Sequence, residues 1–212
     1  MNNQQTIVLE ACVETYEQAM AAEKNDAGRI ELCDRLDLGG ITPPVELIEA
    51  LLENLKIPIM VMVRPRGGHF VYSETEFQLM KIDVGLLKDM GCHGVVFGLL
   101  TSQGEIDVER TRELTELARP MQVTFHKAFD ECIDLFGALE DLKKTGVDRL
   151  LTSGGKATAL EASELLNQLI ERSEGKPQLI VAGKVMHKNI NELKMLIKSA
   201  KEFHGRRIVP GL

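Results

Sequence analysis

The feature that most constrains the fold is a regular alternation of short β-branched runs with longer segments of helical period, from one end of the chain to the other. The runs with strand character are residues 7–12, 29–33, 59–63, 94–97, 122–126, 149–152, 178–182 and 202–204. The segments between them that have helical period are residues 14–25, 43–54, 73–90, 107–118, 131–145, 159–173 and 190–200. This repeated strand–helix unit predicts an α/β fold, a parallel TIM-type (β/α)8 barrel, in one domain over residues 1–212.

Local start and stop signals support these boundaries. Ser73 stands three residues before Glu76, which is the spacing of a capping box at a helix start. Gly28, Gly91 and Gly146 each follow a helical segment and precede a strand, where glycine commonly ends a helix. An open, doubly wound sheet is the alternative architecture, but the GxGxxG pattern typical of that fold does not follow the first strand.

The eighth strand–helix unit is incomplete. After His204 the chain has few residues left, and they are too rich in glycine and proline for an outer helix, so we expect the eighth helix to be short or missing. One flank of the barrel then needs a cover, which either Ile208, Val209 and Leu212 of the tail or a second subunit could supply. We predict a homo-oligomer packed near this flank.

Charge and cysteine content exclude several classes of protein. The net charge of −7 argues against a protein that binds nucleic acid or an anionic membrane surface. Residues 1–6 lack the features of a signal peptide, and no apolar run is long enough to span a bilayer, so the expected location is cytoplasmic. The 4 cysteines are far apart without CxxC spacing, which predicts reduced thiols rather than a disulfide framework or a zinc knuckle.

Polar side chains follow the predicted strands at their carboxyl ends, where barrels of this type carry their functional residues. In chain order they are Glu10, Cys12, Glu31, Cys33, Arg64, Arg66, Thr101, His126, Lys127, Asp130, Thr152 to Lys156, Gly183, Lys184 and His204. The third strand is wholly apolar and runs directly into Arg64 and Arg66, followed by two glycines. Forked guanidinium donors beside glycine backbone favour an anion-binding site at Arg64 and Arg66, although both arginines could instead pair with the protein's own carboxylates.

Two glutamates lie within runs that otherwise have the character of buried strands. A buried carboxylate needs a partner, and we expect Arg64, on the neighbouring strand, to pair with Glu31. His126 is the other partner expected, across the mouth of the barrel. The candidate catalytic residues are Glu10, Glu31, Arg64, His126 and Asp130, which could transfer a proton on a bound anion. A closed structural network of paired charges is the alternative.

The segment after the sixth strand is a second candidate for anion binding. Ser153, Gly154 and Gly155 can form a nest of backbone N–H groups, with Lys156 beside it. A Gly-Gly turn is also a common way to connect a strand to a helix, so a purely structural turn is the alternative.

Cys12 and Cys33 occupy matching positions, each two residues after a glutamate on neighbouring strands. Parallel strands lie about 4.8 Å apart, which is close enough for two thiolates to hold one soft ion such as Cu(I). The same separation suits a disulfide, and two buried cysteines can also serve only as small apolar packing groups.

Several of these segments together resemble the CutC family of copper homeostasis proteins. The matching segments are Leu9-Glu10-Ala11-Cys12-Val13-Glu14, Arg29-Ile30-Glu31-Leu32-Cys33, Val63-Arg64-Pro65-Arg66-Gly67-Gly68, Gly94-Val95-Val96-Phe97-Gly98, Val123-Thr124-Phe125-His126-Lys127-Ala128-Phe129-Asp130 and Leu151-Thr152-Ser153-Gly154-Gly155. The resemblance implies a cytoplasmic TIM-type barrel, usually oligomeric, that is associated with copper tolerance and holds Cu(I) through Cys12 and Cys33. The chain departs from the family at Ala182-Gly183-Lys184-Val185-Met186, where relatives carry a turn with more glycines.

Two functions follow as hypotheses. The first is a copper homeostasis protein that binds a copper ion through Cys12 and Cys33. The alternative is a TIM-barrel enzyme that acts on an unidentified small anionic substrate at the mouth formed by the strand ends.

Overall fold

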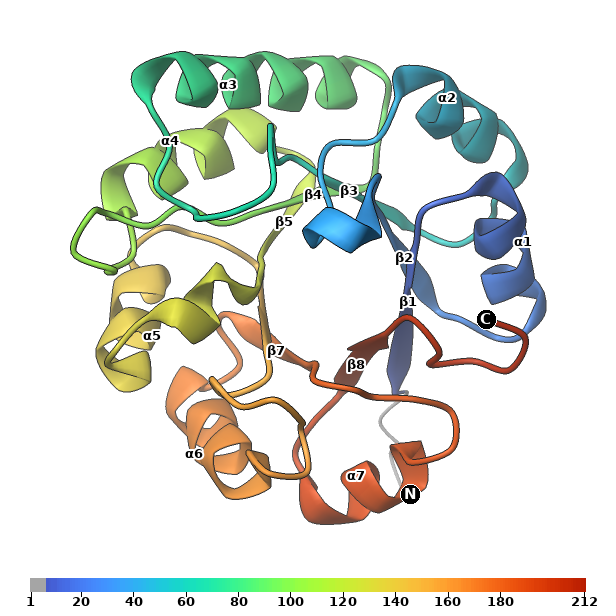
Figure 1. The fold of residues 1–212 in the computed structure, drawn as a ribbon, viewed down its shortest axis with the longest axis vertical. Coiled ribbons are helices and arrows are strands. Elements are labelled where there is room, and N and C mark those ends of the chain that lie inside the picture. Colours follow the sequence, from blue (N-terminus) through green and yellow to red (C-terminus); the bar gives the residue numbers. More distant parts are fainter. Residues whose placement is uncertain (1–6) are drawn as a thin grey trace.

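The computed structural model describes residues 7–212, and in them eight parallel strands form a closed ring surrounded by seven α-helices (Figure 1). The strands are β1 Val8–Val13, β2 Arg29–Leu32, β3 Ile59–Met62, β4 Gly94–Phe97, β5 Gln122–Phe125, β6 Arg149–Thr152, β7 Gln178–Val181 and β8 Glu202–Gly205. Because β8 pairs with β1, the sheet is a TIM-type barrel, as predicted, and the alternative of an open sheet is wrong. Residues 1–6, on which the prediction about a signal peptide rests, lie outside the described residues.

Each helix lies between two successive strands in the sequence and packs on the outside of the ring. The helices are α1 Tyr16–Lys24, α2 Val45–Asn54, α3 Glu74–Asp89, α4 Val108–Ala118, α5 Leu135–Lys143, α6 Ser163–Ser173 and α7 Ile190–Leu196. Two short 3-10 turns, η1 Leu36–Leu38 and η2 Lys127–Glu131, follow β2 and β5. Within residues 7–212, no helix has both the length and the apolar character needed to cross a bilayer.

Side-chain caps define several helix starts. The capping box predicted at Ser73 and Glu76 is present at the start of α3. The helix predicted from residue 131 begins later, because the chain first forms η2 and Asp134 then caps α5. The Asp134 carboxylate accepts hydrogen bonds from the backbone N–H groups of Phe136 and Gly137, at 3.0 and 3.1 Å.

Alternate residues of the strands lie in two different environments. In β2, Ile30 and Leu32 belong to the apolar core between the sheet and the helices. Arg29 and Glu31 point instead into the barrel, where their side chains contact charged groups of other strands. All four side chains are buried, so the barrel encloses a polar interior within an apolar shell.

The tail takes the place of an eighth helix. Residues 206–212 form no helix, and in Figure 1 the chain end lies beside α1. Ile208 and Val209 are each only 1% exposed, and Leu212 packs against the same core. The tail is therefore one cover for this flank, as expected, and the homo-oligomer packed near it stays a prediction.

Candidate functional site

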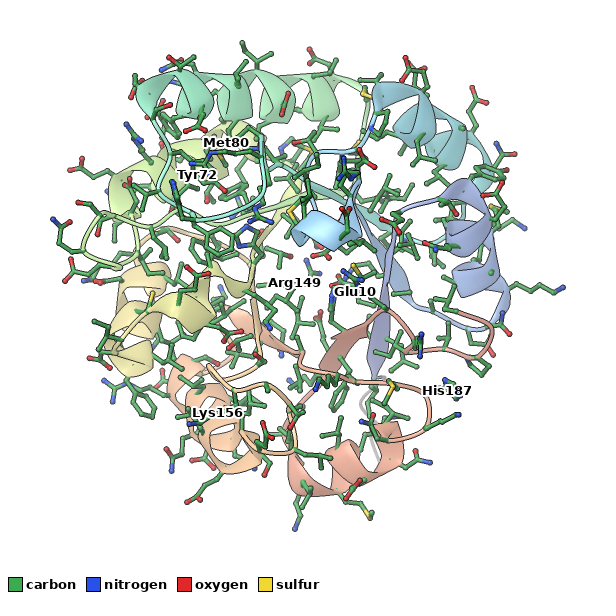
Figure 2. The ribbon with its side chains drawn as sticks, viewed as in Figure 1. Glu10, Tyr72, Met80, Arg149, Lys156 and His187 are labelled. Carbon is green, nitrogen blue, oxygen red and sulfur yellow. The ribbon has the colours of Figure 1, made fainter. Side chains whose placement is uncertain are left out.

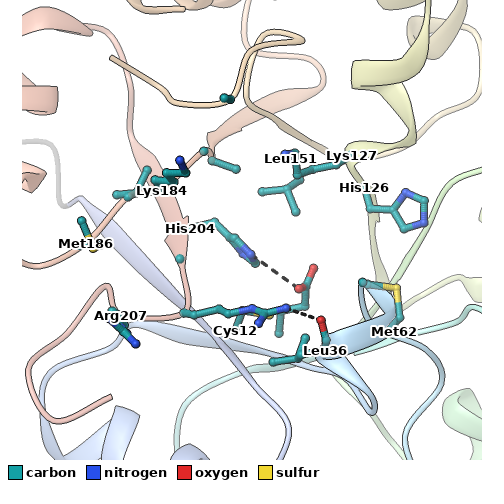
Figure 3. Close-up of a pocket in the computed structure, with 18 of the residues that line it drawn as sticks. Cys12, Leu36, Met62, His126, Lys127, Leu151, Lys184, Met186, His204 and Arg207 are labelled. Carbon is teal, nitrogen blue, oxygen red and sulfur yellow. Dashed lines mark hydrogen bonds and ion pairs between the residues drawn. The ribbon is translucent and has the colours of Figure 1, made fainter. Parts of the chain in front are cut away.

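A cavity of about 610 Å³ opens at the carboxyl ends of the strands, and we call it the mouth cavity. It is bounded by the ends of β1, β2, β3, β5 and β6 and by the loops at residues 182–186 and 204–207 (Figure 3). Of the predicted site residues, Cys12, Glu31, Arg64 and His126 line it. The expectation that distant strands bring thiol, carboxylate, guanidinium and imidazole groups to one opening is met for these four.

The two predicted cysteines lie together beside this cavity. The strand register places Cys12 opposite Glu31, and the Cys33 thiol donates to Glu31 Oε2 at 3.6 Å. The sulfur atoms of Cys12 and Cys33 and a carboxylate oxygen of Glu31 all lie within 4.8 Å of one another. These distances show that the two cysteines share one face, as predicted. Both are buried free thiols.

Neighbouring groups give the two thiols opposite acidities. The neighbouring Cys33 thiol holds the pKa of Cys12 well below its usual value, against the effect of burial, and His204 lowers it further. Contact with Cys12, together with burial, raises the pKa of the Cys33 thiol well above its usual value. Cys12 is therefore the more acidic thiol of the pair.

His204, on β8, connects this thiol pair to the carboxylates inside the barrel. Its Nδ1 lies 2.8 Å from Glu10 Oε1, and its Nε2 lies 3.7 Å from Glu31 Oε2. Burial alone would lower the pKa of His204, but the Glu31 charge and hydrogen bonds with Cys12 and Glu10 raise it well above 6.5. This shift favours a protonated His204, whose two ring nitrogens face the carboxyl groups of Glu10 and Glu31; burial raises the pKa of Glu31 itself well above its usual value. The sequence marked it as a strand-end residue without giving it a role.

Glu10 lies below the mouth cavity in a buried ionic network. Its carboxylate pairs with Arg29, Arg29 bonds Glu202 at 2.5 Å, and Glu202 lies 3.2 Å from Arg149. Burial would raise the pKa of Glu10, but Arg29 and His204 lower it to about 2. Figure 2 shows Glu10 and Arg149 near the centre of the ring. This arrangement makes Glu10 a paired structural anion and not a proton acceptor for a ligand.

The sequence pattern does not mark the cationic members of this network as site residues, because of their position. Arg29 and Arg149 are the first residues of β2 and β6, at the amino ends where charged residues usually serve stability. Their partners follow from the strand register, in which Glu10 stands opposite both Arg29 and His204, and this register is visible only in the structure.

The predicted pairing of Arg64 with Glu31 is wrong. The Arg64 guanidinium donates to the backbone carbonyls of Gly40 at 2.9 Å and Gly68 at 2.7 Å, and more weakly to that of Leu38 at 3.4 Å. These carbonyls belong to the loops after β2 and β3, which fold over the strand ends. Arg64 is 4% exposed and lines the mouth cavity, so it remains a candidate for binding an anion.

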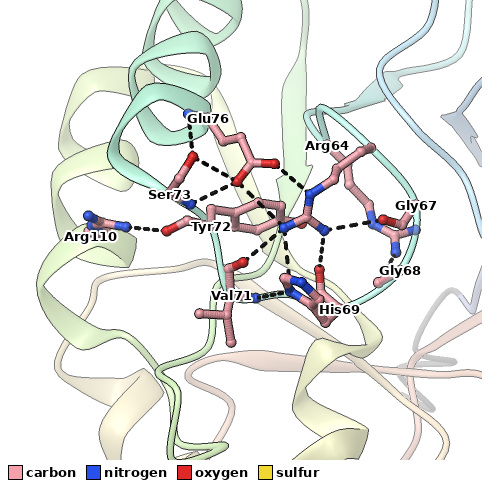
Figure 4. A network of polar contacts seen from close by, with 10 residues as sticks. Arg64, Gly67, Gly68, His69, Val71, Tyr72, Ser73, Glu76 and Arg110 are labelled. Atoms are coloured by element: carbon pink, nitrogen blue, oxygen red, sulfur yellow. Dashed lines mark hydrogen bonds and ion pairs between the residues drawn. The ribbon is translucent and has the colours of Figure 1, made fainter.

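Arg66 does not line the mouth cavity but takes part in a different contact network, whose members Glu76, His69, Val71 and Tyr72 are labelled in Figure 4. Its Nε bonds Glu76 at 2.5 Å, and its other nitrogens donate to the carbonyls of His69 at 2.8 Å and Val71 at 2.9 Å. The guanidinium also lies over the Tyr72 ring, 5.1 Å from its centroid. Arg66 therefore anchors the start of α3, in agreement with the alternative that it pairs with the protein's own carboxylate.

The predicted nest at Ser153, Gly154 and Gly155 is already filled by Asp130. The Asp130 carboxylate accepts hydrogen bonds from Ser153 N at 3.0 Å, Ser153 Oγ at 2.8 Å, Gly155 N at 3.0 Å and Thr152 Oγ1 at 2.5 Å. The N–H of Gly154 donates to Thr152 Oγ1 at 2.9 Å. The backbone does bind an anion, but that anion belongs to the protein. This contact joins η2 to the end of β6, and neither Asp130 nor the nest lines the mouth cavity.

His126 is neutral in this environment. Burial, and then the nearby charge of Arg64, lower its pKa to about 3. Its Nδ1 accepts a hydrogen bond from Ala128 N at 3.2 Å, so the ring hydrogen is assigned to Nε2, which has no partner among the described residues. His126 therefore offers a hydrogen-bond donor and lacks the free basic nitrogen expected of a general base.

These observations define the class of protein: a parallel (β/α)8 barrel with a buried thiol, carboxylate and imidazolium cluster at the carboxyl ends of its strands. The family model described as "CutC family" matches residues 7–208. The chain belongs to the CutC family.

Named relatives agree with this assignment. The chain is 43% identical over 197 residues to the copper homeostasis protein cutC homolog of Mus musculus, covering 93% of this chain and 72% of that protein. The human homologue is 42% identical with the same coverage. The crystal structure of the copper homeostasis protein CutC from Streptococcus agalactiae has a TM-score of 0.91 at 30% identity, over 96% of this chain and 100% of the other.

More distant structures show only the fold. The phosphoribosyl anthranilate isomerase of Thermococcus kodakaraensis has a TM-score of 0.59 at 13% identity, over 94% of this chain and 87% of the other. This similarity confirms the barrel architecture and carries no information about the reaction or the ligand.

Proposed function

We propose that this protein acts in copper homeostasis by holding Cu(I) between Cys12 and Cys33. The observation that carries the proposal is the buried cluster in which both sulfur atoms and a Glu31 oxygen lie within 4.8 Å of one another. The homology to copper homeostasis proteins supports the identity of the metal.

The donor set fits a soft monovalent ion. Thiolates are the ligands that Cu(I) prefers, and Cys12 is already biased toward the thiolate form by its neighbours. Cys12 and Cys33 pack with Leu36, Met60 and Met62 in one apolar cluster, which surrounds the thiols with soft and water-excluding groups. Glu31 Oε1 is buried without a hydrogen-bond partner, so the cluster has an acceptor atom that the protein itself does not satisfy.

The residues around the thiols have separate tasks in this proposal. His204 carries a positive charge beside Cys12 and stabilises its thiolate before the ion arrives. Glu10 holds the His204 ring through Nδ1 at 2.8 Å and is itself fixed by Arg29. Bound Cu(I) would supply charge neutralisation of the thiolates, and thiol coordination requires reduced cysteines, from which we infer a cytoplasmic location.

The experiment is a competition titration of the apoprotein against a chromogenic Cu(I) chelator under anaerobic conditions. We expect the Cys12→Ser/Cys33→Ser protein to lose about a hundredfold or more in Cu(I) affinity. Cys92→Ser/Cys132→Ser is the matched control, because it also removes two buried thiols and both lie outside the cluster. The control should bind Cu(I) as the wild type does.

Thermal unfolding of all three proteins shows whether each variant is folded. Unchanged affinity and stoichiometry in a folded Cys12→Ser/Cys33→Ser protein would refute the thiol site. Equal losses in both double variants would refute it as well, because the effect would then not be specific to the cluster.

We also infer that the protein forms a homo-oligomer. The support is a row of exposed apolar side chains on α3, made of Leu79, Ile82 and Leu86, which are 48%, 65% and 42% exposed. Their spacing of three and four residues places them on one face of the helix, and contiguous exposed apolar surface commonly marks a contact with another protein.

A further inference from the structure

The mouth cavity gathers positive charge in a protein that is negative as a whole. Its lining contains five lysine and arginine side chains and one acidic residue, Glu31, whereas the net charge of the chain is −7. The five are Arg64, Lys127, Lys184, Arg206 and Arg207. Copper binding by two thiols does not require these positive side chains, because positive side chains repel a metal cation and attract an anion.

The innermost of these cations has no acidic partner among the described residues. Arg64 is 4% exposed, and its hydrogen bonds go to neutral carbonyl groups only. Burying a guanidinium without a counter-ion is unfavourable unless neighbouring dipoles compensate for the lost hydration. Its Nε has no hydrogen-bond partner, so one donor of the fork is still free.

A second free donor lies beside Arg64. The Nε2 of neutral His126 also lacks a partner, and the Phe70 ring covers both residues. The ring centroid of Phe70 lies 4.7 Å from the Arg64 guanidinium and 4.8 Å from the His126 ring centroid. Phe70 is half-buried and lines the mouth cavity together with Arg64 and His126.

The outer cations come from the loops after β7 and β8. Figure 3 shows Lys184 and Arg207 on one side of the cavity and His126 on the other, with His204 between them. The side chains of Lys184 and Arg207 are exposed and form no ion pair among the described residues, whereas Lys127 lies 3.6 Å from Asp130 and Arg206 donates to Leu36 O at 2.5 Å. Lys184 and Arg207 are thus the two outer cations available to a ligand.

We propose that the mouth cavity binds a small organic anion whose carboxylate or phosphate group contacts Arg64 and His126 and whose remaining charge lies near Lys184 and Arg207. A cavity of about 610 Å³ is large enough for a metabolite-sized molecule. This binding site does not depend on copper, and it is the site that an enzyme acting on a small anionic substrate would need.

The test is isothermal titration calorimetry in a phosphate-free buffer of low ionic strength. Citrate probes carboxylate binding and glycerol 3-phosphate probes phosphate binding. We expect at least one of the two to bind the wild type, and Lys184→Ala/Arg207→Ala to weaken that binding about tenfold. Lys24→Ala/Lys198→Ala is the matched control, because it removes two exposed cations that are absent from the cavity lining. The control should bind within about twofold of the wild type.

Arg64→Met gives a second measurement from the inner end of the cavity. A folded Arg64→Met protein should lose binding of the same probe, with folding checked by thermal denaturation. The proposal is overturned if neither probe binds the wild type up to about 10 mM. It is also overturned if both double variants lose affinity equally, which would show a general charge effect.

Discussion

At the scale of single residues, burial and neighbouring charge decide what identical side chains can do. Burial raises the pKa of Cys92 and of Cys132 to about 11, whereas Cys33 and His204 lower that of Cys12. All of these cysteines are buried, so residue type and burial alone do not single out the reactive thiol. The difference lies in what each sulfur touches.

The neutral state of His126 gives a prediction about stability and pH. The folded protein keeps His126 neutral down to a pKa of about 3, whereas the unfolded chain binds the proton near the ordinary pKa of 6.5. Between these values the unfolded state binds more protons, so stability falls as the pH falls. We predict that His126 alone lowers the free energy of unfolding by about 2 kcal/mol between about pH 7 and about pH 5.

Urea denaturation at the two pH values measures how much the free energy of unfolding changes with pH in the wild type and in His126→Gln; we call this change the pH slope. The variant should lose the part of the pH slope that comes from His126, whatever its absolute stability. His69→Gln, which changes a histidine on an exposed loop, is the control and should keep the wild-type slope. An unchanged slope in His126→Gln would show that this ring is not held neutral in the folded state.

The sequence predicted which residues line the mouth cavity better than it predicted the hydrogen-bond and ion-pair partners of those residues. Strand ends placed Cys12, Glu31 and His126 correctly, because a parallel barrel brings all carboxyl ends to one side. The pairing of Arg64 with Glu31 failed because the loops after β2 and β3 supply carbonyl groups to Arg64, and loop conformation does not follow from the periodicity of strands and helices.

At the scale of secondary-structure elements, one carboxylate connects two strand ends. Asp130, in η2, accepts hydrogen bonds from four donors at the end of β6 and directly after it: the Thr152 and Ser153 hydroxyls and the backbone N–H groups of Ser153 and Gly155. The sequence identified the glycine-containing turn as an anion nest, which is correct in chemistry. It missed the occupant because Asp130 lies 23 positions from Ser153 in the chain.

We predict that Asp130→Ala destabilises the protein by about 3 kcal/mol, because several buried donors lose their acceptor at once. Chemical denaturation measures the effect. Asp130→Asn, which keeps the shape and some acceptor capacity, should lose less. Asp141→Ala removes a more exposed ion pair with Lys144 and should change stability by less than about 1 kcal/mol. If Asp130→Ala is as stable as this control, the contact has no structural role.

At the scale of the whole molecule, the alternation of eight strand runs with seven helical segments was sufficient to predict the closed barrel and the seven helices that residues 7–212 form. The number and order of the elements follow from periodicity, and the handedness of parallel crossovers leaves few other arrangements. The charged interior below the mouth was not predicted, because it arises from the stagger between strands, which sets Val8 and Glu10 opposite Glu202 and His204.

The oligomeric state is a property of the whole molecule. We expect the wild type to be a homo-oligomer in light scattering at micromolar concentration, and Ile82→Glu on α3 to shift it to the monomer by placing a charge in the apolar row. Met195→Glu on α7, where the side chain is 67% exposed beside the flank that lacks a helix, is the comparison. Dissociation by Met195→Glu alone would place the interface at that flank, and a monomeric wild type would contradict the prediction.

The closure of the ring by its last strand has a consequence for how the protein is made. Among the described residues, β8 is the one strand that pairs with both β7 and β1. β8 follows the other seven strands in chain order, so β1 and β7 have unpaired edges until β8 has been synthesised. We therefore expect a chain cut short before β8 to form an open sheet that is prone to aggregation.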